Sequence, residues 1–226
     1  MSLALTPYAL IGPQSRRNEF LAHSKAPEPA YFGELPPTRH EFPRYRMMID
    51  LALDDAPERI RLYAYRTGQV VIGCAVKKSL AEMVYQAGVP VQGHLIGINS
   101  LPTFLARPTW EVSAYAKEGG EVLTALQDWL GIELTRAPDQ VGMITPRTLF
   151  MIINEAYEVM QEGTATEEDI DLAMRLGTNY PEGPIAWSRE IGLENIVSVI
   201  ENLRKTTGQG RYRVSPLLKE RMWKGM

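Results

Sequence analysis

The feature that most constrains the fold of this chain is the stretch from Asp139 to Leu203, where three amphipathic segments are joined by short corners marked by glycine and proline. Apolar residues recur in each segment with the spacing of one helix face: Leu149, Ile152, Ile153, Ala156 and Met160; then Ile170, Ala173, Met174 and Leu176; then Leu193, Ile196, Val197, Ile200 and Leu203. Gly163 and Gly177 are natural helix ends, and Thr166 is a candidate N-cap. The stretch therefore predicts a helical domain.

The residues before this stretch alternate between strand and helix patterns. Strands are expected at residues 8–11, 47–53, 69–76, 94–98 and 110–115, and helices from Asp54, from Leu80 to a stop at Gly88, and over residues 120–130. Such alternation predicts an α/β domain with a mainly parallel sheet. Residues 24–43 contain five prolines and no periodicity, so a loop or extended cover is expected there. We place the α/β domain at residues 1–138 and the helical domain at residues 139–226.

Composition excludes several classes of protein. A net charge of −3 and a pI near 5.7 argue against a protein that coats nucleic acid. No run approaches the roughly twenty apolar residues that span a bilayer, and the N-terminus lacks the basic region of a signal peptide, so we expect a cytoplasmic protein without membrane contact. The single cysteine, Cys74, rules out an internal disulfide and is expected in a buried strand.

Two further groups of residues are candidates for ligand sites. His23 and His40 have no carboxylate or cysteine at ligand spacing, so no metal site is expected. The basic pairs Arg44/Arg46 and Lys77/Lys78 would bind an anionic ligand only if they lined one cleft.

Several irregularly spaced motifs carry a resemblance to a known family. They are GMI..R at residues 142–147, NEA at 154–156, EEDID.AM at 167–174, GP at 183–184 and IGLENI at 191–196. In this order they resemble the C-terminal domain of 3-hydroxyacyl-CoA dehydrogenases. The resemblance implies a Rossmann-like domain followed by an all-α domain, similar to the C-terminal domain of 6-phosphogluconate dehydrogenase, that forms a homodimer through its helices.

The resemblance also implies a nicotinamide site, which this sequence does not match. A G-x-G-x-x-G loop should follow the first strand, but residues 12–17 read GPQSRR and retain only Gly12. Arg16 and Arg17 are expected in a solvated turn. The long helix, second strand and ribose-binding acidic residue implied for residues 24–43 are not recognisable, so the first domain is expected to be shortened. We therefore expect no cofactor, or NAD only if the ancestral activity survives.

The catalytic positions implied by the resemblance are also altered. The family uses a histidine base held by a glutamate about twelve residues later; here Asn99 takes the place of the histidine and Glu111 that of the glutamate. An amide cannot accept a proton at neutral pH. His94 precedes Asn99 by five residues and is expected to be structural.

Two further polar positions carry over less directly. Pro146 replaces an asparagine of the family, and the family's serine segment corresponds to residues 76–80. Within that segment, Ser79 is expected to cap a helix, and Lys78 occupies the position that corresponds more closely to the family's serine.

These substitutions predict a divergent, catalytically impaired member of the family. It would bind an acyl-CoA-like or other small ligand, or act as a partner subunit. Two alternatives remain open at this point. One is an active oxidoreductase that converts 3-hydroxyacyl-CoA to 3-oxoacyl-CoA with an altered site, in which burial raises the pKa of Glu111 and makes it the base. The other is a structural dimer without a ligand.

Overall fold

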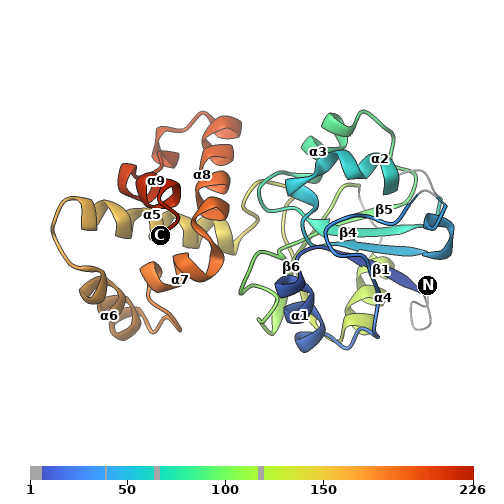
Figure 1. Cartoon of the computed structure of the whole chain (residues 1–226), viewed down its shortest axis with the longest axis horizontal. Helices are drawn as coiled ribbons and strands as arrows, with labels where there is room; N and C mark the ends of the chain where they lie inside the picture. Colours follow the sequence, from blue (N-terminus) through green and yellow to red (C-terminus); the bar gives the residue numbers. More distant parts are fainter. Residues whose placement is uncertain (1–6, 39, 64–66, 117–119) are drawn as a thin grey trace. The chain divides into compact units, whose positions relative to one another are not determined.

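The computed structural model describes residues 7–38, 40–63, 67–116 and 120–226. The chain forms two compact units, Met1–Met143 and Ile144–Met226 (Figure 1). The predicted division after residue 138 lies slightly earlier, because the intervening residues are bound to the first unit. The Asp139 carboxylate accepts hydrogen bonds from the backbone N–H groups of Leu80 and Ala81, and Gly142 N–H donates to the Val76 carbonyl.

The N-terminal unit is built on one seven-stranded sheet with the order β2-β1-β3-β4-β5-β6-β7. All neighbouring pairs are parallel except β5 and β6, which confirms the predicted α/β class. The strands are β1 Tyr8–Ile11, β2 Ala30–Tyr31, β3 Met47–Asp50, β4 Val70–Cys74, β5 His94–Ile98, β6 Thr109–Ala114 and β7 Glu133–Arg136.

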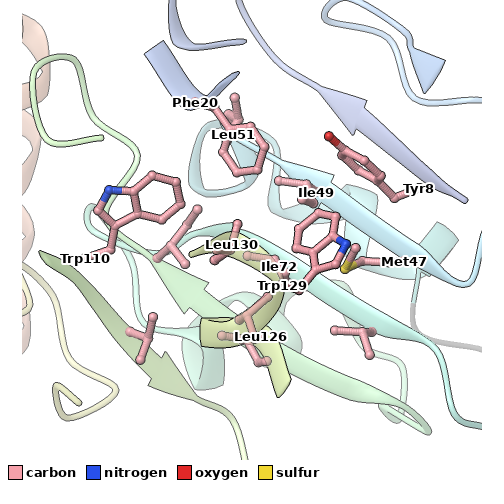
Figure 2. Packing of buried hydrophobic residues seen from close by; sticks show 14 of the residues in the cluster. Tyr8, Phe20, Met47, Ile49, Leu51, Ile72, Trp110, Leu126, Trp129 and Leu130 are labelled. Atoms are coloured by element: carbon pink, nitrogen blue, oxygen red, sulfur yellow. The ribbon is translucent and has the colours of Figure 1, made fainter. Parts of the chain in front are cut away.

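Helices cover both faces of this sheet, α1 and α4 on one side and α2 and α3 on the other (Figure 1). They are α1 Gln14–His23, α2 Ile60–Tyr63, α3 Leu80–Ala87 and α4 Gly120–Leu130. The main core lies under α1 and α4, where the Trp110 ring packs against Phe20 and the Trp129 ring meets Tyr8 edge-on (Figure 2). The strands supply the branched and aromatic side chains of this face, as their continuous burial requires.

Three elements of this unit were not predicted. A helix, α1, begins directly after Pro13, where the sequence suggested a turn, and β7 follows α4. Residues 24–43 contain a two-residue strand, β2, that pairs with β1. The loop or extended cover expected over residues 24–43 therefore contains one short strand. Between β2 and β3 the described residues contain one short 3₁₀ helix, Phe42–Arg44, and no α-helix.

The C-terminal unit consists of five helices in its described sequence: α5 Thr145–Gln161, α6 Glu167–Thr178, α7 Pro184–Ile191, α8 Leu193–Thr207 and α9 Pro216–Trp223. Helix α5 packs against α7, α8 and α9. The three predicted helices are present, and Thr166 caps α6 by accepting a hydrogen bond from Asp169 N–H. Helices α7 and α9 were not predicted, because each begins at a proline after an irregular segment.

The predicted inward face of α6 was wrong. Ile170 is buried, but Ala173 is exposed and Leu176 retains 78% of its accessible surface. Helix α6 packs mainly against α7, and most of its residues after Asp171 are exposed. No helix in the part of the chain that the structure describes is long and apolar enough to cross a membrane.

Candidate functional site

The parallel strands of the sheet end at one edge, where α/β proteins bind their ligands. Strands β1, β3, β4 and β5 end at Ile11, Asp50, Cys74 and Ile98. Because β1 lies between β2 and β3, the strand order reverses direction between β1 and β3. The crevice outside these two ends is the place where a doubly wound sheet opens for a ligand.

The backbone at the end of β1 is already engaged by the chain itself. Gly12 N–H donates to the Gly33 carbonyl at 2.7 Å, and the Tyr31 hydroxyl donates to the Gly12 carbonyl at 2.9 Å. A Cβ atom on Gly12 would lie 2.9 Å from the Cβ atom of Leu51, so the glycine permits close approach of β1 to the end of β3. Pro13, which caps α1, has no N–H to offer an anion.

Arg16 fills the space above β3, and the prediction that it lies in a solvated turn was wrong. Its side chain is buried and its Nη1 atom donates to the Leu51 carbonyl at 2.6 Å. Ser100 Oγ donates to the same carbonyl at 3.0 Å. The reason is that α1 begins at once after Pro13, which turns Arg16 toward the sheet.

These residues do not fit a dinucleotide. A pyrophosphate needs free backbone N–H groups at the start of the first helix and small residues that let it approach. Here the Gly12 N–H is used by the Gly33 carbonyl, Pro13 has no N–H, and Arg16 of α1 is held by the Leu51 carbonyl. Arg17 lies over the Tyr31 ring, 5.0 Å from its centroid, and pairs with Glu28.

Asn99 and Glu111, which the resemblance predicts to take the places of the family's histidine and glutamate, are brought together. Asn99 follows β5 directly, and its backbone N–H donates to the Glu111 carbonyl at 3.3 Å. The antiparallel register places Ile98 opposite Val112, so Asn99 lies opposite Glu111 and their side chains share one face of the sheet. Ile98 and Val112 point into the core under α4, so this shared face is the one that α3 covers.

The charged neighbour of Glu111 is Arg107. Burial lowers the pKa of Arg107, and the Glu111 carboxylate opposes that shift by favouring the charged guanidinium. Asn99 is buried and its Oδ1 atom accepts a hydrogen bond from Leu101 N–H at 3.4 Å. The glutamate that would orient a histidine in the family therefore has an arginine nearby and an amide opposite.

Other predicted residues take structural places. Ser79 caps α3 by accepting a hydrogen bond from Glu82 N–H at 3.1 Å, and Lys78 Nζ donates to the Asp54 carbonyl at 2.8 Å. His94 begins β5 and thus lies at the end of the strand remote from Asn99. Pro146 is buried in the first turn of α5, in the C-terminal unit.

The basic pairs do not line one cleft. Arg44 and Arg46 are exposed and precede β3, whereas Lys77 and Lys78 follow β4. Because β3 and β4 are parallel neighbours, the two pairs lie at opposite edges of the sheet. Lys77 is buried and pairs with Asp55.

Sequence reasoning missed the buried polar residues at this edge. Asp54 was expected to cap a helix, but its carboxylate accepts hydrogen bonds from the backbone N–H groups of Val76 and Lys77 at 2.9 and 2.8 Å. Burial and the Asp54 carboxylate raise the pKa of the Cys74 thiol to about 12, so the thiol stays protonated at neutral pH. No pattern in the sequence distinguishes Asp54, Arg16 and Ser100 from surface residues.

No group of three or more metal-ligating side chains occurs in the described ranges of the chain. His23 and His40 are both exposed.

Both units of the chain are similar to parts of known proteins. Residues 142–225 match the family model of the 3-hydroxyacyl-CoA dehydrogenase C-terminal domain. The chain is 47% identical over 91 residues to 3-hydroxyadipyl-CoA dehydrogenase of Escherichia coli, a match that covers 40% of this chain and 19% of that relative. The chain thus spans about a fifth of the length of this curated relative.

Two solved structures extend the likeness. The crystal structure of 3-hydroxybutyryl-CoA dehydrogenase from Escherichia coli is 30% identical, with a TM-score of 0.57, over 68% of this chain and 31% of that chain. (S)-3-hydroxybutyryl-CoA dehydrogenase from Ralstonia eutropha is 18% identical and shares the fold over 97% of this chain and 94% of its own, with a TM-score of 0.72. The C-terminal unit therefore matches the C-terminal domain of the 3-hydroxyacyl-CoA dehydrogenase family, and the N-terminal unit shares the Rossmann-like fold of solved 3-hydroxybutyryl-CoA dehydrogenases.

Proposed function

We propose that this chain is a divergent family member that has lost NAD-dependent hydride transfer and now binds an acyl-CoA-like ligand, or serves as a partner subunit, in the cytoplasm. The observation that carries the proposal is the filled crevice between β1 and β3, where Arg16 and Ser100 both donate to the Leu51 carbonyl. Both side chains are buried, and the Gly12 backbone is itself hydrogen-bonded to Gly33 and Tyr31.

The residues near β5 and β6 support the same proposal. Oxidation of a hydroxyl needs a base within hydrogen-bond reach of the proton it removes. The position aligned with that base holds the amide of Asn99, which cannot take a proton. Glu111 keeps its place, and its charged neighbour is Arg107, whose guanidinium is stabilised in its charged form by the Glu111 carboxylate.

Replacing the amide by the family's base tests which loss matters. We expect that Asn99→His does not produce NADH from 3-hydroxybutyryl-CoA and NAD, because the cofactor crevice remains filled by Arg16. The measurement is NADH absorbance at high enzyme concentration, with an authentic 3-hydroxybutyryl-CoA dehydrogenase as positive control. Circular dichroism of the variant verifies folding. Turnover by Asn99→His that rises at least tenfold above the wild-type background would overturn the proposal.

One observation favours the alternative of an active oxidoreductase with an altered site. The carboxylate of Glu111 is retained, and this residue lies directly opposite Asn99. If the wild-type chain formed NADH and Glu111→Gln abolished that activity, the alternative would replace our proposal. We expect no activity in either protein.

Self-association through the C-terminal unit is a second part of the proposal. Leu172 and Leu176 project from α6 with 47% and 78% of their surface accessible, and α6 is the least covered helix of its unit. Burial of an apolar side chain contributes about 25 cal/mol per Å², so an uncovered leucine pair favours a partner. A second copy of the chain fits the dimer that the family resemblance implies.

The dimer is tested by placing a charge on this face. We expect Leu176→Glu to weaken self-association at least tenfold, measured by size-exclusion chromatography with light scattering across a concentration series. Leu35→Glu is a matched control, because Leu35 is 77% exposed in the N-terminal unit. A wild-type chain that is monomeric at every concentration, or equal weakening by both substitutions, would contradict the dimer.

A further inference from the structure

A basic pocket lies in the C-terminal unit, which contains neither Asn99 nor Glu111. It has a volume of about 410 Å³ and is lined by residues of α8, of α9 and of the segment between them. The lining residues are Glu201, Arg204, Lys205, Tyr212, Arg213, Val214 and Lys219. This volume is within the range of about 300–1,000 Å³ typical of small-molecule sites.

Positive charge is concentrated at this pocket although the unit as a whole carries more carboxylates than basic residues. Four basic side chains line it, against the single carboxylate of Glu201. Two more, Arg147 and Arg211, contact its Tyr212.

The two arginines around Tyr212 converge on one atom. Arg211 Nη2 donates to the Tyr212 hydroxyl oxygen at 2.8 Å and Arg147 Nη2 donates to the same oxygen at 3.0 Å. Their guanidinium groups lie 4.7 and 5.6 Å from the centroid of the Tyr212 ring. The Tyr212 hydroxyl oxygen is their common acceptor, so the two guanidinium groups are held close together without a carboxylate between them in the described structure.

Pairing leaves much of the charge in the pocket uncompensated. Lys219 pairs with Glu201, and Arg213 lies 3.5 Å from Glu158. Arg204 and Lys205 are exposed, and neither has an ion-pair partner among the residues the structure describes.

The helix dipole accounts for only part of this arrangement. Arg204 and Lys205 lie in the last turn of α8, where cations complement the partial negative charge of a helix end. Arg147, Arg211, Arg213 and Lys219 belong to other elements, and the dipole gives no reason for them to gather here. Arginine forks match phosphate oxygens in geometry and charge, and a concave site with several of them suits an anion with more than one negative charge.

We infer that this pocket binds the pyrophosphate group of a small soluble ligand. Arg204 and Lys205, which have no ion-pair partner among the described residues, supply the positive charge that attracts it. Free pyrophosphate and a nucleoside diphosphate share this chemistry. The inference concerns the C-terminal unit alone and does not rest on the proposed loss of hydride transfer.

Calorimetric titration of the full chain with inorganic pyrophosphate and with ADP tests the inference. We expect both to bind with one site per chain at low ionic strength, and the affinity to fall as salt is raised because the contacts are charged. Similar affinities would identify the phosphates as the whole determinant, whereas at least tenfold tighter binding of ADP would identify a nucleotide as the source; either result supports a pyrophosphate site.

Matched variants locate the binding. Arg204→Gln is expected to weaken pyrophosphate binding at least fivefold, while Arg175→Gln, an exposed arginine near the end of α6, is expected to leave it unchanged. Both positions are exposed, so circular dichroism should show folded protein in each case. No binding of either ligand at millimolar concentration, or equal weakening by the two substitutions, would overturn the inference.

Discussion

Trp110→Ala is expected to lower the free energy of unfolding of the N-terminal unit by about 3–5 kcal/mol, the usual cost of removing a large aromatic side chain from a core. Trp110 is 1% exposed, packs against Phe20 with ring centroids 5.6 Å apart and donates its indole N–H to the Leu105 carbonyl at 3.0 Å (Figure 2). The substitution leaves a cavity under α1 and also removes the donor of a buried carbonyl. Urea denaturation followed by circular dichroism measures the loss.

The control for this prediction is Trp223→Ala. Trp223 ends α9 and is 74% exposed, so its removal should change stability by no more than about 0.5 kcal/mol, as for most surface substitutions. A loss below about 1 kcal/mol in Trp110→Ala would mean that the core is not packed as described.

Arg59→Ala is expected to cost about 3–5 kcal/mol at pH 7, because removing one partner leaves a buried charge uncompensated. The Asp50 carboxylate at the end of β3 is fully buried, and Arg59 Nη1 lies 3.3 and 3.2 Å from its two oxygens. Tyr63 donates to the same carboxylate at 2.8 Å. Urea denaturation at pH 7 measures the change.

The cost of Arg59→Ala should depend on pH in a defined direction. Burial raises the pKa of Asp50 above its ordinary value of 3.8, and Arg59 opposes that rise. A carboxyl with a raised pKa in the folded state binds protons more tightly there than in the unfolded chain, so its ionisation lowers stability as pH rises above 3.8. Without Arg59 the folded pKa is higher still, and the difference between variant and wild type should widen from pH 4 to pH 7.

Removing the charge itself provides the control. In the Arg59→Ala background, Asp50→Asn should restore part of the stability at pH 7 and abolish the widening with pH. A stability difference between Arg59→Ala and wild type that is constant over this pH range would show that Asp50 carries no buried charge.

The helical unit could be predicted largely from local patterns. Leu193, Ile196 and Ile200 recur at helical spacing over enough residues to identify α8. Thr166 identifies the start of α6 because the helix cap is a local contact, with a residue three positions away. The exposure of Leu176 could not be predicted, since it depends on how little of α6 its neighbour α7 covers. An amphipathic pattern shows which face is apolar and not what covers it.

The side-chain contacts at the carboxyl ends of the strands were harder to predict, because they too depend on how distant elements pack. The antiparallel register of β5 and β6 places Asn99 opposite Glu111, and no strand pattern in the sequence predicted that register. Arg16 and Ser100 are distant in sequence and meet only because both side chains reach the Leu51 carbonyl at the end of β3. Such contacts are set by the sheet order, so no local pattern reports them.

Calorimetric titration of the wild-type chain with NAD tests the central claim most directly. With Gly12, Arg16 and Tyr31 engaged by the chain itself, we predict no saturable heat up to millimolar NAD, under conditions in which a 3-hydroxybutyryl-CoA dehydrogenase shows clear saturation. Saturable binding of NAD with one site per chain, weakened by a bulky substitution at Gly12, would contradict the account and restore this unit as a cofactor-binding domain.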